Sequence, residues 1–281
     1  MSVVRNQGEL VAVSFRPPAL DETQQRIVNS LREEGIAVSH YDDLFDEPHF
    51  SELEADIASF VHESREKASK AGLAPKKKDE FIVRRFLSRG EDVPKTRFSL
   101  DNLWLRIGAS EKVLGIVNSY RGEASRMYYV DNWFTIPYSG ADKRIASQRW
   151  HRDPEEEHVV KVFLYLSEVD TEAGPFEYVS GSFSGGRYGE FWPLGSGTRH
   201  PPEDELYEVV TPEDRLTLTG PPATMVFCDT GGFHRGGLAL TKPRILATWS
   251  YLSRAGNGRR YQVDFDGREE TLPAQVRAAL A

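Results

Sequence analysis

The run Val159-Val160-Lys161-Val162-Phe163-Leu164-Tyr165-Leu166, the turn Ala173-Gly174-Pro175 and the run Phe176-Glu177-Tyr178-Val179 are the stretch that best indicates the fold of this 281-residue chain. Short runs rich in β-branched and aromatic residues, separated by glycine and proline, are typical of β-strands. Further runs of this kind lie at residues 127–130, 206–210, 223–227 and 245–252. Several short strands in series predict a sandwich or a barrel rather than a parallel sheet with helical crossovers.

The chain before residue 127 has a helical pattern instead. Asp21 can cap a helix that runs through Ile27 and Leu31 and stops near Gly35. Apolar spacing predicts two further helices, at 51–71 and at about 100–120. The short apolar stretch 36–38 is expected to be a strand. We therefore expect one domain over residues 1–281, with a mainly helical support region at 1–126, a β core at 127–253 and a C-terminal tail at 254–281.

The composition argues against several classes of protein. The formal net charge of −8 disfavours a dedicated nucleic-acid binder, which usually carries an excess of basic residues. No run is long and apolar enough to cross a bilayer, and the first residues lack a signal-peptide pattern, so we expect a soluble, cytoplasmic protein. The one cysteine, Cys228, lies in an apolar run where a thiol is usually inert packing. The oligomeric state is left open.

Two His-x-Asp pairs could contribute to a metal site, namely His40 with Asp42 and His151 with Asp153. Residues two apart on a strand point to the same face, so both side chains of such a pair can hold one ion. Iron(II) oxygenases need two histidines and one carboxylate on one face, with positions left open for oxygen and a co-substrate. Neither pair is specific by itself, because the third ligand has to come from elsewhere in the chain.

His234 is the best candidate for the third ligand. It lies in Asp229-Thr230-Gly231-Gly232-Phe233-His234-Arg235-Gly236-Gly237, whose glycines let the backbone come close to a ligand. Arg244 follows ten residues later, and a buried guanidinium needs a carboxylate that its planar fork can hold by two hydrogen bonds. The distal carboxylate of 2-oxoglutarate would supply that partner. His40 and Asp42 lie outside the β region and have no such arginine, so we interpret that pair as structural.

Taken together, these motifs resemble the phytanoyl-CoA dioxygenase family of iron(II)- and 2-oxoglutarate-dependent oxygenases. The resemblance covers about residues 127–253 and rests on Gln148-Arg149-Trp150-His151-Arg152-Asp153, Lys161-Val162-Phe163-Leu164-Tyr165-Leu166 and Ala173-Gly174-Pro175-Phe176-Glu177-Tyr178-Val179-Ser180-Gly181-Ser182, with His234 and Arg244. It implies a double-stranded β-helix (a jelly-roll, cupin-like barrel) that encloses iron and 2-oxoglutarate. His151, Asp153 and His234 match the iron ligands, and Arg244 matches the co-substrate arginine.

The same resemblance bears on the reaction, which uses O2. In related halogenases a small residue replaces the carboxylate ligand, so the presence of Asp153 favours hydroxylation or another oxidation. The chain departs from the family where Phe183 stands in a position that often holds a histidine, which weakens analogy to any named substrate.

Two further residues are candidates for binding the co-substrate. Lys161, Phe163 and Tyr165 would share one face of a strand. If that face points inward, Lys161 is a costly buried charge unless a carboxylate, such as that of 2-oxoglutarate, pairs with it. A solvent-facing Lys161 fits the pattern equally well. Gln148 could donate a hydrogen bond to 2-oxoglutarate or orient a metal ligand.

The substrate is expected to be a small molecule with an unactivated C–H bond. Arginines stand out in an acidic protein and suggest an anionic or polyhydroxylated compound, such as a natural-product intermediate, a sugar acid or an acyl compound; ordinary surface charge explains them equally well. These are Arg149, Arg152, Arg187, Arg199 and Arg235. Residues 181–208 form the expected lid. We interpret the remaining histidines, His49, His62, His158 and His200, as having no ligand role.

Two other functions compete with the oxygenase. One is a jelly-roll protein that binds a small molecule without oxidising it, and the other is a zinc- or manganese-dependent enzyme with the same three ligands. Loss of a metal ligand or of the arginine would favour the binding protein, and neither is lost. Arg244 argues against the zinc- or manganese-dependent enzyme, which needs no anchor for a dicarboxylate.

Overall fold

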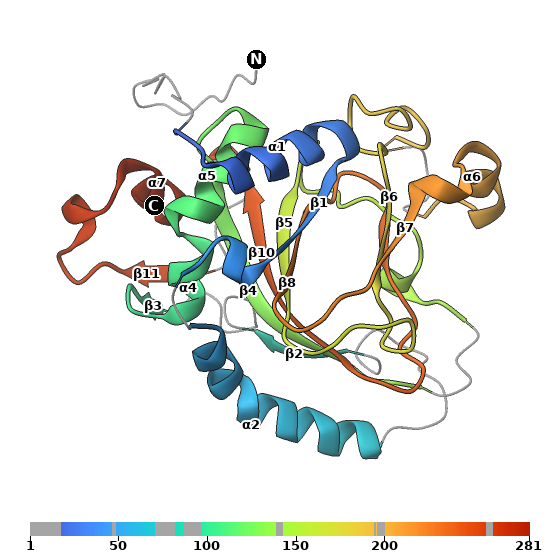
Figure 1. Ribbon diagram of the computed structural model, residues 1–281, viewed down its shortest axis with the longest axis horizontal. Helices are drawn as coiled ribbons and strands as arrows, with labels where there is room; N and C mark the ends of the chain where they lie inside the picture. Colours follow the sequence, from blue (N-terminus) through green and yellow to red (C-terminus); the bar gives the residue numbers. More distant parts are fainter. Residues whose placement is uncertain are drawn as a thin grey trace.

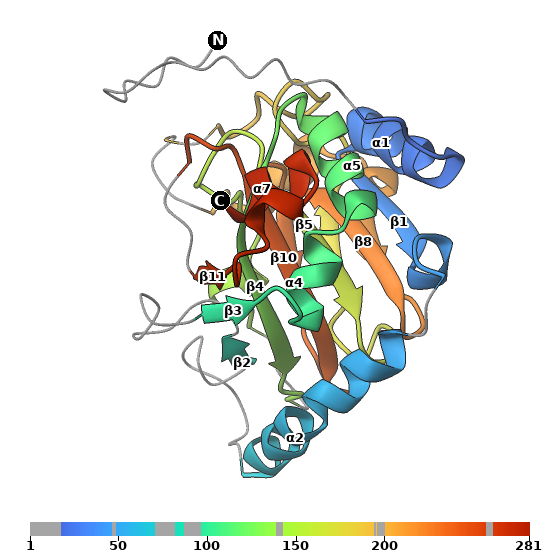
Figure 2. The same ribbon diagram turned by 90° about the vertical axis from the view of Figure 1, so that its left-hand side faces the viewer.

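The structure, a computed structural model, describes residues 18–46, 49–70, 82–86, 97–138, 143–193, 195, 200–256 and 261–281. Its main sheet is antiparallel and six-stranded, with the order β1-β8-β5-β10-β4-β2 (Figures 1 and 2). The strands are β1 (Ile36–His40), β2 (Ile82–Phe86), β4 (Arg126–Thr135), β5 (Val160–Tyr165), β8 (Thr224–Asp229) and β10 (Arg244–Leu252).

A second sheet of three strands faces one side of the main sheet. Its order is β7-β6-β9, formed by β6 (Phe176–Val179), β7 (Arg215–Leu218) and β9 (His234–Gly236). Phe163 and Leu246 of the main sheet form one apolar cluster with Phe176 and Tyr178 of the small sheet. Two facing antiparallel sheets of this kind make a double-stranded β-helix, or jelly roll. The predicted fold class, mostly β with a helical layer, is confirmed.

Helices cover the other face of the main sheet (Figure 2). They are α1 (Glu22–Glu34), α2 (His49–Ser69), α4 (Leu103–Gly108), α5 (Glu111–Arg121) and α7 (Ala274–Leu280). Alternate residues of β10, among them Ala247 and Trp249, point into the apolar core shared with these helices. Trp249 Nε1 donates to the carbonyl oxygen of Trp104 over 2.8 Å, which fixes α4 on the sheet. The remaining residues of β10, beginning with Arg244, therefore face the space between the two sheets.

The start and end of α1 follow from local chemistry. Asp21 and Gln24 form a capping box, because each side chain accepts a hydrogen bond from the other's backbone N–H. Gly35 ends the helix at φ 75°, a left-handed conformation that favours glycine. The predicted helix and the strand that follows it are both confirmed.

Shorter elements complete the described chain. Strands β3 (Arg97–Ser99) and β11 (Gln262–Asp264) pair in parallel beside the helical layer. Helix α6 (Glu203–Val209) lies beyond the small sheet (Figure 1). Single 3-10 turns are Tyr41–Asp43, Ala146–Gln148, Pro212–Asp214 and Glu269–Thr271. Within the described residues, no helix combines the length and apolarity that crossing a membrane requires.

Two predicted elements are wrong in kind or extent. Residues 206–210 were expected as a strand but belong mostly to α6, which begins after Pro202, carries acidic residues in its first turn and buries Leu206. The single helix expected at about 100–120 is two helices, α4 and α5. The break falls at Ala109 and Ser110, because the Ser110 side chain accepts a hydrogen bond from Val113 N and starts a new helix.

Candidate metal and co-substrate site

Backbone hydrogen bonds bring His151, Asp153 and His234 together from two distant segments. His151 and His234 form an antiparallel bridge, in which each backbone N–H donates to the other's carbonyl oxygen over 3.1 and 3.0 Å. Asp153 N donates to the carbonyl oxygen of Thr230 over 2.8 Å and continues the pairing. The segment after Trp150 is thus held against the glycine-rich segment before β9. Fixing both backbones fixes the positions from which the three side chains start.

The two imidazole rings are oriented by their own backbone. His151 Nδ1 lies 2.8 Å from the carbonyl oxygen of Arg149, and His234 Nδ1 lies 3.0 Å from that of Gly232. A carbonyl oxygen only accepts, so each Nδ1 carries the proton, and each Nε2 presents a lone pair. Hydrogen bonds of this kind commonly orient metal-binding histidines.

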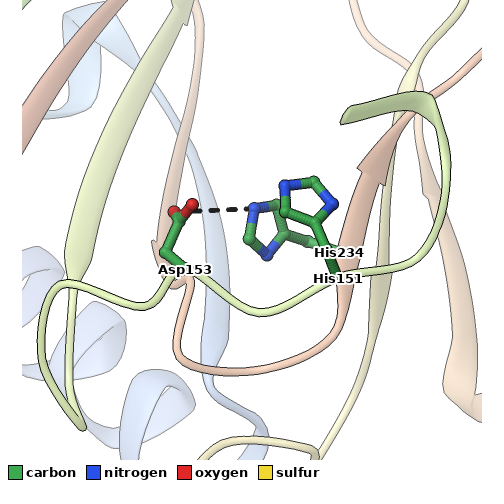
Figure 3. Close-up of side chains that lie close together, drawn as sticks. All are labelled: His151, Asp153 and His234. Atoms are coloured by element: carbon green, nitrogen blue, oxygen red, sulfur yellow. Dashed lines mark ion pairs between the residues drawn. The ribbon is translucent and has the colours of Figure 1, made fainter. Parts of the chain in front are cut away.

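The three side chains point toward one another (Figure 3). One ligand atom from each lies within 4.8 Å of the others, and all three residues are buried. His234 Nε2 is 3.6 Å from Asp153 Oδ2, and the two ring centroids are 4.3 Å apart. Two neutral imidazoles and one carboxylate on one face can hold a divalent metal and leave coordination positions free.

Lys161 holds Asp153 ionised. Its Nζ lies 2.5 Å from Asp153 Oδ2, and both side chains are buried. Burial alone would raise the pKa of Asp153, but the charge of Lys161, followed by those of His234 and His151, holds that pKa below its ordinary value. Lys161 therefore faces inward, and its partner is a residue of the triad. Burial, and then the neighbouring His234, lower the pKa of His151, which favours the neutral ring that binds metals.

Arg244 lines the cavity that the triad also lines. It is a buried cation, and two of its nitrogens have no hydrogen-bond partner in the described part of the chain. It stands at the start of β10, opposite Thr135 of β4, and is 4% exposed. Its Nε and Nη1 find no acceptor in the described part of the chain. Burial lowers the pKa of Arg244, and the nearby Tyr165 and Glu177 offset this only in part. An unpaired buried guanidinium is costly, so this end of the cavity fits an anionic ligand.

Gly236 lies beside this guanidinium. A Cβ at Gly236 would lie 3.3 Å from Arg244 Nη2, a tight contact that the arginine could relieve only by shifting a few tenths of an ångström. The glycine-rich segment around His234 therefore serves both the triad and Arg244.

One cavity of about 430 Å³ joins the triad to Arg244. This volume is within the range of small-molecule sites. Its apolar walls are Ile82, Trp133, Phe163, Phe176 and Leu246, and its other polar lining residues include Tyr129, Ser147, Gln148, Glu155, Lys161 and His200. Gln148 is buried in the wall, and its side-chain oxygen accepts a hydrogen bond from Ile145 N over 3.2 Å.

Other sequence-derived assignments have mixed outcomes. His40 and Asp42 contact each other at 3.3 Å, away from the cavity, as expected of a structural pair. Cys228 is buried, and burial raises the pKa of its thiol well above the ordinary value. His158, for which no ligand role was expected, has a partly exposed ring whose Nδ1 lies 2.6 Å from the buried carboxylate of Asp229.

His200, for which no ligand role was expected, lines the cavity, with its ring 5.9 Å from that of His151. Glu155, the first residue of the acidic run 155–157, also lines the cavity. Only its position two residues after Asp153 could have singled it out.

Three of the five arginines that suggested an anionic substrate have other partners. Arg152 donates to backbone carbonyl oxygens, including that of Gly231 over 2.7 Å. Arg187 pairs with Glu34 and Asp214, and Arg235 pairs with Glu177 and Glu203. Arg149 is exposed, and Arg199 lies outside the described residues. Part of the expected lid at 181–208, namely 194 and 196–199, also lies outside them.

No protein-family model matches the chain, and no curated protein matches it in sequence. Solved structures do match it in fold. The epimerase SnoN, in complex with Fe3+, alpha ketoglutarate and nogalamycin RO, has a TM-score of 0.56 at 13% identity and covers 84% of this chain and 86% of its own.

Two further structures match to the same degree. EctD from S. alaskensis, with 2-oxoglutarate and 5-hydroxyectoine, has a TM-score of 0.56 at 15% identity over 85% of this chain and 87% of its own. The alpha ketoglutarate-dependent carbocyclase SnoK from nogalamycin biosynthesis has a TM-score of 0.54 at 16% identity over 89% and 90%. At such identities the likeness establishes a common fold.

Proposed function

We propose that the protein is an iron(II)- and 2-oxoglutarate-dependent dioxygenase that hydroxylates an unactivated C–H bond of a small molecule. The observation that carries the proposal is the presence, in one cavity, of the convergent triad His151, Asp153 and His234 and of the partnerless guanidinium nitrogens of Arg244. The three proteins named above are described with iron, with 2-oxoglutarate or as dependent on it, and they share this fold. The phytanoyl-CoA dioxygenase family is the family we propose for the chain.

In this proposal the triad holds the metal, and Arg244 holds the distal carboxylate of 2-oxoglutarate. Bound iron and 2-oxoglutarate would together supply, with O2, the oxidant for the C–H bond. The residues of the chain position the metal and the co-substrate and keep water away from them. The two Nδ1–H groups hold the rings with Nε2 toward the metal, and the buried guanidinium offers a two-pronged contact to a carboxylate. The aromatic walls exclude water from the reacting groups.

Lys161 and Gln148 take supporting roles. Lys161 pairs with Asp153 and so lies at the metal end of the cavity, where it can also meet the metal-binding end of the co-substrate. Gln148 lines the wall with its side-chain oxygen already engaged by Ile145 N. We assign it the task of shaping the wall beside 2-oxoglutarate.

Binding of 2-oxoglutarate tests the proposal directly. Protein loaded with manganese(II) is titrated with 2-oxoglutarate in a calorimeter, and release of labelled carbon dioxide is followed with iron(II). Arg244→Met should weaken 2-oxoglutarate binding about 100-fold, as loss of a buried ion pair of roughly 3 kcal/mol implies. Arg254→Met, which removes an exposed arginine, should leave it unchanged. Absence of 2-oxoglutarate binding to the wild-type protein would contradict the proposal.

The alternative functions make a different prediction. A zinc- or manganese-dependent enzyme, or a protein that only binds a small molecule, would hold a metal at the triad without any dependence on 2-oxoglutarate. In either case the wild-type protein would not bind 2-oxoglutarate and would release no labelled carbon dioxide from it. The partnerless nitrogens of Arg244 favour the oxygenase over both.

A further inference from the structure

Three successive glutamates after the triad residue Asp153 have different surroundings. Glu156 accepts hydrogen bonds from Ser253 and from Arg121, so it fastens the chain to neighbouring segments. Glu157 is exposed and accepts a hydrogen bond from Ser184 over 2.5 Å. Glu155 alone of the three lines the cavity.

Glu155 has an oxygen whose hydrogen-bonding capacity is unused. Its Oε2 is buried and has no donor within the described chain. A buried acceptor without a donor costs free energy comparable to that of a lost hydrogen bond, and more when it is charged. Lys161, a cation of the same cavity, gives its hydrogen bond to Asp153 instead.

Glu155 lies two residues after the triad residue Asp153 and lines the same cavity as Lys161 and Tyr129. The Nζ of Lys161 lies 5.9 Å from the ring centroid of Tyr129. Arg244 comes from a different strand, at the start of β10 and opposite Thr135 of β4. The cavity therefore has a cationic end, suited to the co-substrate, and a separate region with an available carboxylate.

We propose that Glu155 binds a protonated amine of the primary substrate, which makes the substrate a small amine with an apolar body. This rests on the proposed function and specifies its substrate class. Aromatic side chains of the same cavity, Tyr129, Trp133 and Phe163, offer a surface for the apolar body and faces that attract a cation. Three of the five arginines that would have favoured an anion, Arg152, Arg187 and Arg235, are engaged elsewhere.

Matched fluorinated probes test this assignment without turnover. The wild-type protein, loaded with zinc(II) and 2-oxoglutarate, is titrated with para-fluorobenzylamine, which is cationic, and with para-fluorobenzyl alcohol, which is neutral and of similar shape. Fluorine NMR gives both dissociation constants. The amine should bind at least about tenfold more tightly, and Glu155→Gln should remove this preference while keeping the affinity for the alcohol. Glu157→Gln, a matched loss of charge two residues away, should keep the preference.

The possible outcomes are distinct. Equal binding of amine and alcohol to the wild-type protein, or a preference that survives Glu155→Gln, overturns the assignment. A preference lost equally in Glu157→Gln overturns it too, because the effect would then be that of net charge. Thermal unfolding checks that the variants are folded, and Glu155→Ala replaces Glu155→Gln if the latter is not. Failure of the wild-type protein to bind 2-oxoglutarate would instead refute the proposed function, and the amine preference would then be measured with zinc(II) alone.

Discussion

The ammonium of Lys161 lies 2.5 Å from Oδ2 of Asp153, so a residue of the triad is already paired with a buried cation before any metal is considered. Both side chains are almost fully buried, at 10% and 8% exposure. Removing one partner of such a pair leaves the other as an uncompensated charge, which is far costlier than losing an ion pair at the surface. This relationship makes the stability of the metal-free protein depend on Lys161.

Lys161→Met should lower the free energy of unfolding of the metal-free protein by about 3 kcal/mol, because Asp153 would remain buried without its cation. Manganese(II) should restore most of the loss, since a bound metal supplies positive charge to the same carboxylate. The measurement is urea denaturation with a chelator and with excess manganese(II). Lys242→Met breaks the exposed pair with Asp170 and should leave the free energy of unfolding nearly unchanged in both conditions. An equal loss with and without metal would refute the interpretation.

Arg244→Met should have the opposite effect on stability. Without a ligand, burial of Arg244 is opposed by its unpaired nitrogens, so a long apolar side chain there should raise the free energy of unfolding by about 1 kcal/mol or more. The same substitution should abolish stabilisation by added 2-oxoglutarate. Thermal unfolding of wild-type and variant protein, with and without 2-oxoglutarate and manganese(II), measures both effects. A variant less stable than the wild type in the absence of ligand would show that Arg244 has a structural role.

Local patterns in the sequence were enough to predict the triad and Arg244. His151 and Asp153 are two residues apart. His234 begins β9 and Arg244 begins β10, so only a short strand and one turn separate them. Residues whose role depends on the path of a loop could not be predicted in this way. His200 reaches the cavity through a hydrogen bond from its Nδ1 to the carbonyl oxygen of Trp150, fifty residues earlier. No periodicity indicates such a contact.

The strand wrongly predicted at 206–210 also has a physical explanation. Val209 and Val210 have high β-propensity, which favoured a strand. The preceding residues decide otherwise, because Pro202 and the acidic residues of the first turn start a helix, and Leu206 becomes its buried contact. Propensity over five residues was therefore a weaker signal than the chemistry of the helix start.

His158 should make stability depend on pH. Its Nδ1 lies 2.6 Å from Asp229, and that hydrogen bond raises the pKa of His158 above 6.5. Because the folded-state pKa is raised, the stabilising contribution is fully present below pH 6.5 and is lost as the pH rises through the raised value. The difference in free energy of unfolding between the wild type and His158→Asn should therefore shrink between pH 6 and pH 9, as denaturation at several pH values would measure. A pH-independent difference for His158→Asn would contradict the prediction.

Arg152 should fix the position of the segment that follows β6. It lies between His151 and Asp153 in the sequence and donates to the carbonyl oxygens of Ser182, Tyr188, Gly189, Phe191 and Gly231. Arg152→Met would remove these five hydrogen bonds and should lower the free energy of unfolding by at least about 3 kcal/mol. Hydrogen exchange should be faster at the amides of Tyr188 and Phe191. Arg187→Met, which removes a half-exposed guanidinium from the same region, should cost less than about 1 kcal/mol. Unchanged exchange in Arg152→Met would mean that other contacts hold the segment.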